Sequence, residues 1–267
     1  MRLKGESFMK KTLIALAVAA SAAVSGSVMA WDASGDSGPV VLSGLLTPQD
    51  NITPWEVAIG PAVTTLNADI KKGQKDVYII TENAIPVLGI RTAKAEAFKG
   101  QPGIAPQINY GGAVDVNKFA ASVAPLTLDV KDVHDAKIGT LVAPIFAQGR
   151  ISIKSISGKG WQGKYWMYAS DTGMAFFGGL PKNAGAVSEA DMASSLMPAV
   201  EQNYINQGVG DTKPDISRVN GSDGLYSVYY FSAIKPLSTV TITLDSPAQG
   251  NEPIVWKADL PITVSYQ

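Results

Sequence analysis

The sequence contains no cysteine among its 267 residues, and it contains a single histidine, His134. The missing thiols exclude a disulfide framework, a thiolate zinc site and a cysteine nucleophile. One imidazole also excludes a metal site with two histidine ligands. His134 has no nucleophile motif beside it, so we expect a solvated turn residue. The sequence has no Gly-x-Ser-x-Gly, phosphate-loop or calcium-loop pattern. We therefore expect a protein that is not an enzyme and needs no metal or other cofactor.

Charged residues are scarce as well. Asp, Glu, Lys and Arg make up 17% of the chain, and the formal net charge is −1. Soluble chains have about 25% charged residues on average. A nearly neutral chain lacks the basic surface that attracts nucleic acid, so we expect no nucleic-acid partner. The 26 glycines and 16 prolines favour short strands joined by tight turns.

The chain begins with a segment that is typical of export. A basic start at Met9 is followed by an apolar stretch over 12–23 and by a small-residue cleavage motif that ends at Ala30. The pattern predicts a signal peptide over 1–30, in which 1–8 come from an upstream start codon. The alternative is a membrane anchor, but the apolar stretch is shorter than the ~20 residues that a span needs. The mature chain is therefore predicted to be exported.

The rest of the chain predicts mostly strands. Short β-branched or aromatic stretches, bounded by Gly, Pro, Asn or Asp, predict strands at 55–59, 77–80, 87–90, 104–110, 126–130, 138–146, 150–156, 165–168, 174–177, 225–233, 239–244 and 254–266. Their number and spacing favour a mainly β fold, built as an antiparallel sandwich.

One stretch has a helical pattern instead. Apolar residues recur every four positions, at Met192, Leu196, Val200 and Tyr204. An acidic first turn behind Ser188 is typical of a helix start. We predict a small helical insert over 188–206 that packs through this stripe and is kinked or split at Pro198, because proline lacks the donor N–H.

Both ends of the mature chain alternate between apolar and polar residues. Every second residue from Trp256 to Tyr266 is apolar, which places these side chains on one face of a strand. Near the expected N-terminus, Val40, Leu42, Gly44 and Leu46 alternate in the same way. This segment can be the first strand of the chain's own sandwich. It can also add a strand to the sheet of another molecule.

Several segments carry a family resemblance in the same order along the chain. They are the signal sequence from Met9, Trp31 with Gly35, Asp36 and Gly38, and the segments 54–60, 88–92, 103–108, 175–180 and 260–266. Together they resemble the FaeG-like family of fimbrial subunits, with its ClpG-type relatives. Ala58 and Ile59 depart from the family pattern.

The resemblance implies a chaperone–usher pilin. Its fold is an incomplete immunoglobulin-like antiparallel sandwich that lacks its last strand. The implied organisation is a donor-strand extension over 31–46 and a pilin domain over 47–267 with an insert around 157–222. Val40, Leu42, Gly44 and Leu46 then form the donor face, and Leu260, Ile262, Val264 and Tyr266 lie on the terminal strand that flanks the groove and contacts the chaperone.

The implied partners are a periplasmic pilus chaperone, an outer-membrane usher, neighbouring fimbrial subunits and a host glycoconjugate receptor. The implied location is a cell-surface fimbrium that is reached through the periplasm, where the subunit mediates adhesion to host intestinal cells. Two alternatives stay open. One is a minor or tip-proximal subunit without receptor binding, and the other is a self-contained exported carbohydrate-binding sandwich.

The segment 158–168 is the local candidate for receptor binding, because it contains four aromatic residues and two lysines. Aromatic faces stack on sugar rings, and polar side chains hydrogen-bond sugar hydroxyls. We predict that Trp161 lies exposed at a loop tip, with Lys164, Tyr165 and Trp166 as further receptor residues. In the alternative interpretation, 165–168 is a strand with one face in the core. The resemblance implies a galactose-type sugar.

Overall fold

A computed structural model describes residues 43–44 and 53–267. Its strands are β1 (Trp55–Ile59), β2 (Asp76–Ile80), β3 (Ile85–Thr92), β4 (Phe98–Lys99), β5 (Pro106–Asn109), β6 (Val123–Lys131), β7 (Lys137–Ser155), β8 (Gly163–Tyr168), β9 (Asp215–Ile216), β10 (Gly224–Ile234), β11 (Thr239–Leu244) and β12 (Thr263–Tyr266). The helical turns are η1 (Val116–Lys118), η2 (Ala184–Ala186), α1 (Ala193–Leu196) and η3 (Pro198–Glu201). The predicted mainly β fold with a small helical insert is confirmed.

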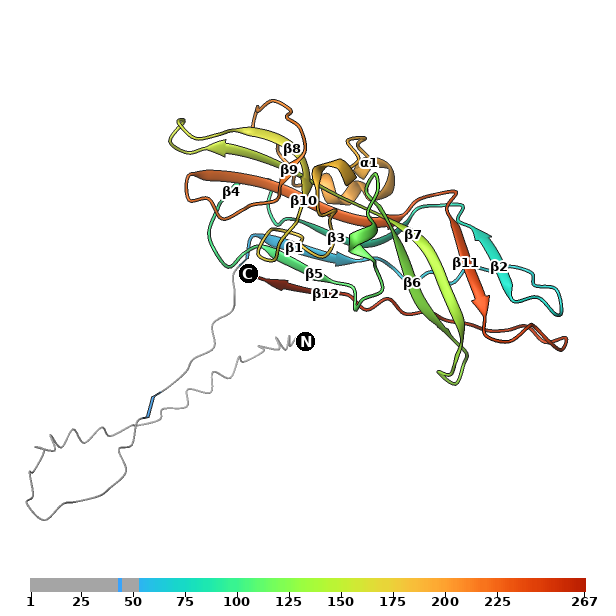
Figure 1. Ribbon diagram of the computed structural model, residues 1–267. Helices are drawn as coiled ribbons and strands as arrows, with labels where there is room; N and C mark the ends of the chain where they lie inside the picture. The colour runs from blue at the N-terminus through green and yellow to red at the C-terminus, as the bar shows by residue number, and fades with distance from the viewer. Residues whose placement is uncertain (1–42, 45–52) are drawn as a thin grey trace, which may run out of the picture. The chain divides into compact units, whose positions relative to one another are not determined.

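Ten of the strands form one large sheet, whose main path runs β1-β3-β10-β7-β11-β2 (Figure 1). β5 and β12 form a second, two-stranded sheet. All strand pairs are antiparallel except β8 with β9, which is parallel. In the described ranges, no helix is long and apolar enough to cross a membrane.

β7 corrects one prediction, because the segments 138–146 and 150–156 belong to a single strand. Gly149 looks like a break in the sequence, yet it pairs with Tyr230 of β10. A Cβ at Gly149 would lie 2.6 Å from the Met167 side chain and 3.3 Å from the Tyr229 carbonyl oxygen. The glycine therefore allows a close approach within a continuous strand and does not end it.

The predicted helix over 188–206 is wrong in its length. Only α1 and η3 are helical, and Pro198 opens η3, so the predicted split at this proline is confirmed. The apolar stripe does form a packing face. Leu196 and Val200 are buried against Phe146 and Phe231, which lie on β7 and β10.

Two predicted strands are also corrected. The segment 174–177 is a turn, in which Phe176 has a φ of +62° and Phe177 makes an isolated bridge to Gln107. The predicted strand over 254–266 has a ladder only at Thr263–Tyr266. His134 lies exposed in the turn between β6 and β7, as predicted.

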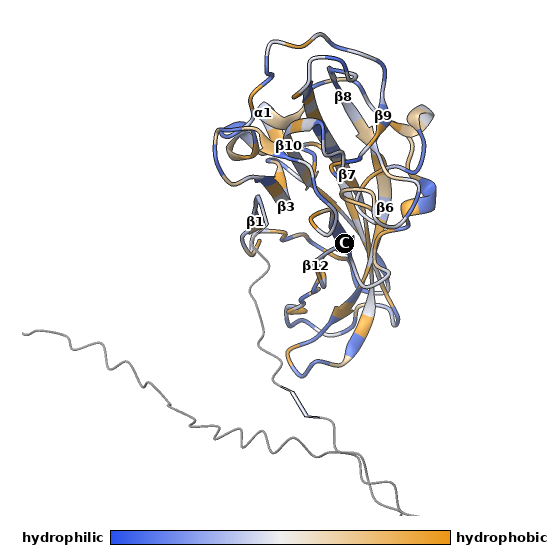
Figure 2. Cartoon of the chain, turned by 90° about the vertical axis from the view of Figure 1, so that its left-hand side faces the viewer, coloured by the Kyte–Doolittle hydropathy of each residue, from blue (hydrophilic) through white to orange (hydrophobic). Residues whose placement is uncertain are grey.

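Most buried side chains belong to one core between the large sheet and the small sheet. A second cluster lies on the other face of the large sheet, where the insert covers Phe146, Trp166, Tyr229 and Phe231. Figure 2 shows the domain from the end that carries β12 and the C-terminus, with α1 beside β10. The large sheet is therefore packed on both faces along part of its length.

Candidate assembly edge and candidate receptor surface

The C-terminal segment is hydrogen-bonded along one edge only. β12 pairs with β5, Gln267 exchanges two backbone bonds with Ala105, and Lys257 exchanges two with Lys131. These bonds use odd-numbered residues, and successive backbone N–H groups of an extended strand point to opposite edges. The even-numbered N–H groups therefore face the second edge, where no described residue bonds them.

The side chains of this segment alternate between the core and solvent. The odd-numbered side chains are exposed. Those that pack on the core, and stay only partly buried there, are Trp256, Ala258, Leu260, Ile262, Val264 and Tyr266. A strand whose core-facing side chains are all half-exposed lacks cover along its free edge.

β1 has a free edge of the same kind, because it pairs only with β3. Trp55 is buried, but Val57 and Ile59, which alternate with it on one face, are 42% and 60% exposed. The Trp55 indole N–H donates to the Ile104 carbonyl at 2.6 Å, and the next residue, Ala105, bonds Gln267. The start of β1 and the end of β12 thus meet at residues 104–105, and each strand leaves one edge unpaired among the described residues.

The residues predicted to form the donor face cannot be placed in this geometry. Val40, Leu42 and Leu46 lie outside the described residues. Gly44 is described, and it is exposed and belongs to no strand or helix.

A loop at the end of β7 presents the candidate receptor residue Trp161. The Asp223 carboxylate accepts hydrogen bonds from the Ser155 and Ser157 hydroxyls at 2.7 and 2.9 Å, and from the Ser157 N–H at 2.8 Å. These bonds lower the pKa of Asp223. The Ser155 hydroxyl also accepts from the Gly160 N–H at 2.9 Å. The loop is therefore fixed at its base although its tip is exposed.

Trp161 is 53% exposed, so the predicted exposure is confirmed. One edge of its ring lies over Gly163, where a Cβ would be 2.8 Å from the indole and 3.2 Å from the Thr212 methyl. The ring centroid is 5.6 Å from that of Tyr165 in an edge-to-face arrangement. The indole thus rests against Gly163 and Tyr165 and leaves about half of its surface to solvent.

Lys164 lies beside residues 211–212, which also approach Trp161. Its ammonium group lies 3.3 Å from the Asp211 carboxylate, which also binds the Arg150 guanidinium. Burial alone would raise the pKa of Asp211, but hydrogen bonds from Arg150 and Lys164 lower it overall. Trp161 and Lys164 therefore both border residues 211–212: the Asp211 carboxylate pairs with Lys164, the Thr212 methyl lies near the indole, and the Thr212 hydroxyl donates to the Lys164 carbonyl at 3.4 Å.

The other two predicted receptor residues lie elsewhere. Tyr165 is 3% exposed and belongs to the main core, and its hydroxyl donates to the Ile216 carbonyl at 2.9 Å. Trp166 is 5% exposed, and Arg150 stacks on its ring at 4.3 Å. Tyr165 therefore supports Trp161 from the main core, whereas Trp166 belongs to the cluster on the other face of the sheet. In residues 43–44 and 53–267, no group of three or more His, Cys, Asp or Glu side chains could hold a metal ion.

The family model described as "Fimbrial, major and minor subunit" matches residues 9–267 of the chain. The chain belongs to this family of fimbrial subunits. The F41 fimbrial protein of Escherichia coli is 27% identical, and the match covers 97% of this chain and all of that protein. The K88 fimbrial protein AD of the same species is 28% identical with the same coverage. The K88 fimbrial protein AB is 30% identical over 80% of this chain and 78% of its own length. As a member of the family, the chain polymerises with other fimbrial subunits.

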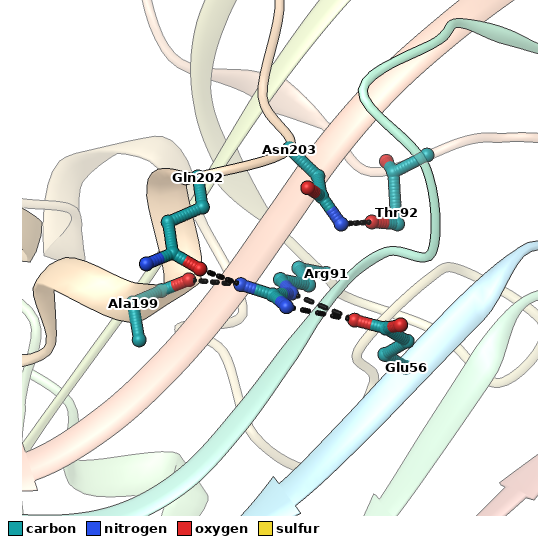
Figure 3. A network of polar contacts seen from close by, with 6 residues as sticks. All are labelled: Glu56, Arg91, Thr92, Ala199, Gln202 and Asn203. Atoms are coloured by element: carbon teal, nitrogen blue, oxygen red, sulfur yellow. Dashed lines mark hydrogen bonds and ion pairs between the residues drawn. The ribbon is translucent and has the colours of Figure 1, made fainter.

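In this fimbrial subunit the insert is tied to the β1 edge by Arg91 of β3 (Figure 3). Its guanidinium donates to Glu56 of β1 at 2.9 Å and to the Gln202 side chain at 2.8 Å. The Asn203 amide donates to the Thr92 carbonyl at 2.9 Å. A hollow of about 530 Å³ lies between β1 and η3, with Gly89 and Met197 among its lining residues. The β1 edge and the insert are thus linked through the Arg91 side chain.

Sequence reasoning missed Asp211, Thr212 and Asp223 as parts of the fimbrial subunit's Trp161 surface. Asp211 and Thr212 follow Trp161 by about fifty residues and carry no motif. Only the parallel approach of residues 211–212 to Lys164 brings them to the loop.

Proposed function

We propose that this fimbrial subunit is assembled by the chaperone–usher pathway through donor-strand complementation. In this proposal, a periplasmic chaperone first supplies a strand to the open edge of β12. The N-terminal extension 31–46 of a neighbouring subunit then replaces it in a cell-surface fimbrium. The observation that supports it best is the row of core-facing, half-exposed side chains from Trp256 to Tyr266 beside a free edge.

An added strand would supply what this region lacks. Its backbone would bond the even-numbered N–H groups of the C-terminal segment, and alternate side chains would cover the exposed Val57 and Ile59. Leaving both edges open would expose a template for aggregation. Val40, Leu42 and Leu46 have the spacing of such side chains, and Gly44 would pass a shallow part of the groove.

A pair of neighbouring substitutions tests the assembly proposal. Gly44→Leu adds a bulky side chain to the donor face, and Ser43→Leu adds the same side chain to the opposite face. We expect Gly44→Leu to abolish fimbriae while the subunit is still secreted and captured by the chaperone. Ser43→Leu should assemble normally. Electron microscopy of fimbriae and periplasmic subunit levels provide the two readouts, and normal fimbriae from Gly44→Leu would contradict the proposal.

We further propose that the subunit binds a galactose-type host glycan through the Trp161 surface, and so mediates adhesion to host intestinal cells. The exposed indole provides a stacking face, and Lys164, Asp211 and Thr212 provide polar groups beside it. Aromatic rings together with hydroxyl, carboxylate and ammonium groups match the alternating apolar and polar faces of a sugar.

The receptor proposal is tested at Trp161. Trp161→Ala should reduce cell binding per fimbria at least tenfold, whereas Trp161→Phe should keep part of it because a ring face remains. Fimbrial yield should change little, since the side chain is half exposed. Reduced yield with unchanged binding per fimbria would show a structural role instead and would refute the receptor function.

A further inference from the structure

The outer face of the large sheet is covered along only part of its length. Leu196 and Val200 of the insert cover Phe146 of β7 and Phe231 of β10. Val142 and Pro144 of β7 share this face with Phe146, because side chains two and four positions apart point the same way. Yet Val142 is 42% exposed, and no helical element covers the sheet toward β2 (Figure 1).

We define the bare face as the outward residues of four adjacent strands: Tyr78 and Ile80 of β2, Thr239 and Thr241 of β11, Val142 and Pro144 of β7, and Pro125 and Thr127 of β6. The strand register places Tyr78, Thr241, Val142 and Thr127 in one row. A hollow of about 310 Å³ between β6 and β11 lies over this region. Tyr78 and Ile80 are 66% and 54% exposed.

The bare face contains no charged side chain, and charges begin at its border. In the next row, the Thr243 hydroxyl donates to Asp76 at 2.7 Å, and Lys137 pairs with Asp129 at 2.5 Å. Nucleic acids and anionic lipid surfaces are bound through Lys and Arg, which are missing here. Apolar and aromatic side chains without charge are typical of the central part of a protein–protein interface.

Leu237 extends the bare face and adds an independent observation. It lies in the turn between β10 and β11, is 79% exposed and has a φ of +60°. Its N–H donates to the Thr81 carbonyl at 2.7 Å, which places it beside Ile80. Left-handed backbone favours Gly or Asn, so a leucine there costs stability. An exposed apolar side chain kept at such a cost indicates a surface that is covered in the assembled protein.

We propose that the bare face packs against a neighbouring copy of this subunit in the fimbria. The proposal rests on membership in a family of polymerising subunits, and it needs neither donor-strand exchange nor receptor binding. The position of the face fits a copy of the chain. β2 and β11 lie at the opposite end of the domain from the C-terminus and the start of β1 (Figure 1). Copies that repeat head to tail bring opposite ends of the subunit together.

The absence of cysteine allows a direct test, because one introduced thiol is the only thiol of the chain. Ile80→Cys places it on the bare face. Val133→Cys places it at a position that is 63% exposed, in the turn between β6 and β7 outside the bare face. Maleimide labelling is measured for each variant in the soluble subunit before assembly and in purified fimbriae.

We expect the thiol of Ile80→Cys to label rapidly in the soluble subunit and at least tenfold more slowly in fimbriae. The thiol of Val133→Cys should label equally in both. Equal labelling of Ile80→Cys in both states would overturn the proposal. Protection already in the soluble subunit would show that the face is covered before assembly and would also overturn the proposal.

A second variant covers the case in which Ile80→Cys does not assemble. Tyr78→Cys lies in the neighbouring row and is read out in the same way. If neither variant forms fimbriae while soluble subunit levels stay normal, the bare face is needed for assembly, which supports the proposal. Gly44→Leu separates the two proposals. Normal fimbriae from Gly44→Leu would contradict donor-strand complementation, whereas equal labelling of Ile80→Cys in both states would contradict packing through the bare face.

Discussion

At the scale of single residues, one buried amide holds the insert on the large sheet. Gln148 is 1% exposed, and its side-chain NH₂ donates to the carbonyls of Ser188 and Ala190 at 2.9 Å each. Its carbonyl oxygen accepts from the Met192 N–H at 3.4 Å. The segment before α1 has no strand to pair with, so this side chain satisfies its backbone groups.

Gln148→Met keeps the length of the side chain but removes these bonds. We expect a loss of about 1–3 kcal/mol in the free energy of unfolding, because two part-buried hydrogen bonds are removed. Gln101→Met, at an exposed turn, is the control and should change the stability by less than about 0.5 kcal/mol. Urea unfolding of the purified subunit compares the two variants, and equal effects would contradict the role of Gln148.

We expect Asp223 to make the Trp161 loop sensitive to acid. Hydrogen bonds from Ser155 and Ser157 lower the pKa of Asp223 in the folded state. A lowered folded-state pKa adds stability above the unfolded pKa of ~3.9, and this contribution is lost as the pH falls through the folded-state value. Trp161 fluorescence should therefore change below about pH 4 in the native chain. In Asp223→Asn the acid transition should be missing and the loop loosened at neutral pH. An unchanged acid transition in Asp223→Asn would assign it to another group.

At the scale of elements, the sequence predicts the strands well where their pattern is local. β1 has the predicted bounds, and β11 does as well. The misses have physical reasons. Gly149 lies inside β7 because Met167 and Tyr229 approach it too closely for a side chain. The apolar stripe from Met192 forms only the short helices α1 and η3, because Pro198 lacks a donor N–H. The alternation after Trp256 is real, but most of it lacks a ladder, since one edge has no partner strand in the described chain.

Alanine substitutions at two glycines with similar backbone angles distinguish the cost of left-handed backbone from the cost of a steric clash. Gly173 and Gly178 have φ values of +83° and +85°. A Cβ at Gly173 meets nothing within 4 Å, whereas one at Gly178 would lie 2.0 Å from the Ile108 carbonyl oxygen of β5. Gly173→Ala should cost roughly 1–2 kcal/mol from the left-handed backbone alone. Gly178→Ala should cost roughly 1–3 kcal/mol more because β5 must shift. Thermal unfolding of the two variants tests this, and equal losses would refute the close contact.

The two faces of β12 provide a matched comparison for assembly. Val264 points to the core and is half-buried, whereas Ser265 is exposed. Burial of an apolar side chain contributes up to about 1.5–3 kcal/mol, so Val264→Asp should prevent capture by the chaperone and lead to proteolysis. Tyr266→Asp should act in the same way, whereas Ser265→Asp should be tolerated. Periplasmic subunit levels decide it, and normal levels of Val264→Asp with the chaperone present would contradict the assembly proposal.

At the scale of the whole molecule, the sequence predicts the alternating pattern at both ends of the chain but not which distant segments contact one another. The alternation at the C-terminus predicts a strand with one apolar face, and the structure adds that its second edge is unpaired among the described residues. No pattern in the sequence predicts that residues 211–212 lie beside Trp161, or that Tyr78 and Val142 share a row. Those contacts depend on strand register, which local patterns do not determine.

Deleting residues 31–46 distinguishes a pilin from a self-contained sandwich. If the segment acts in a neighbouring subunit, the chaperone complex should form at the level of the full chain while fimbriae disappear. A sandwich that used Val40–Leu46 as its own first strand should instead lose thermal stability and accumulate less. Deletion of 31–38 alone is the control, since it removes only the polar lead and should leave assembly intact. Subunit pull-down with the chaperone, thermal unfolding and electron microscopy give three independent readouts. A destabilised chain without 31–46 would refute the donor-strand role, because the structure over 53–267 would then depend on a strand from its own chain.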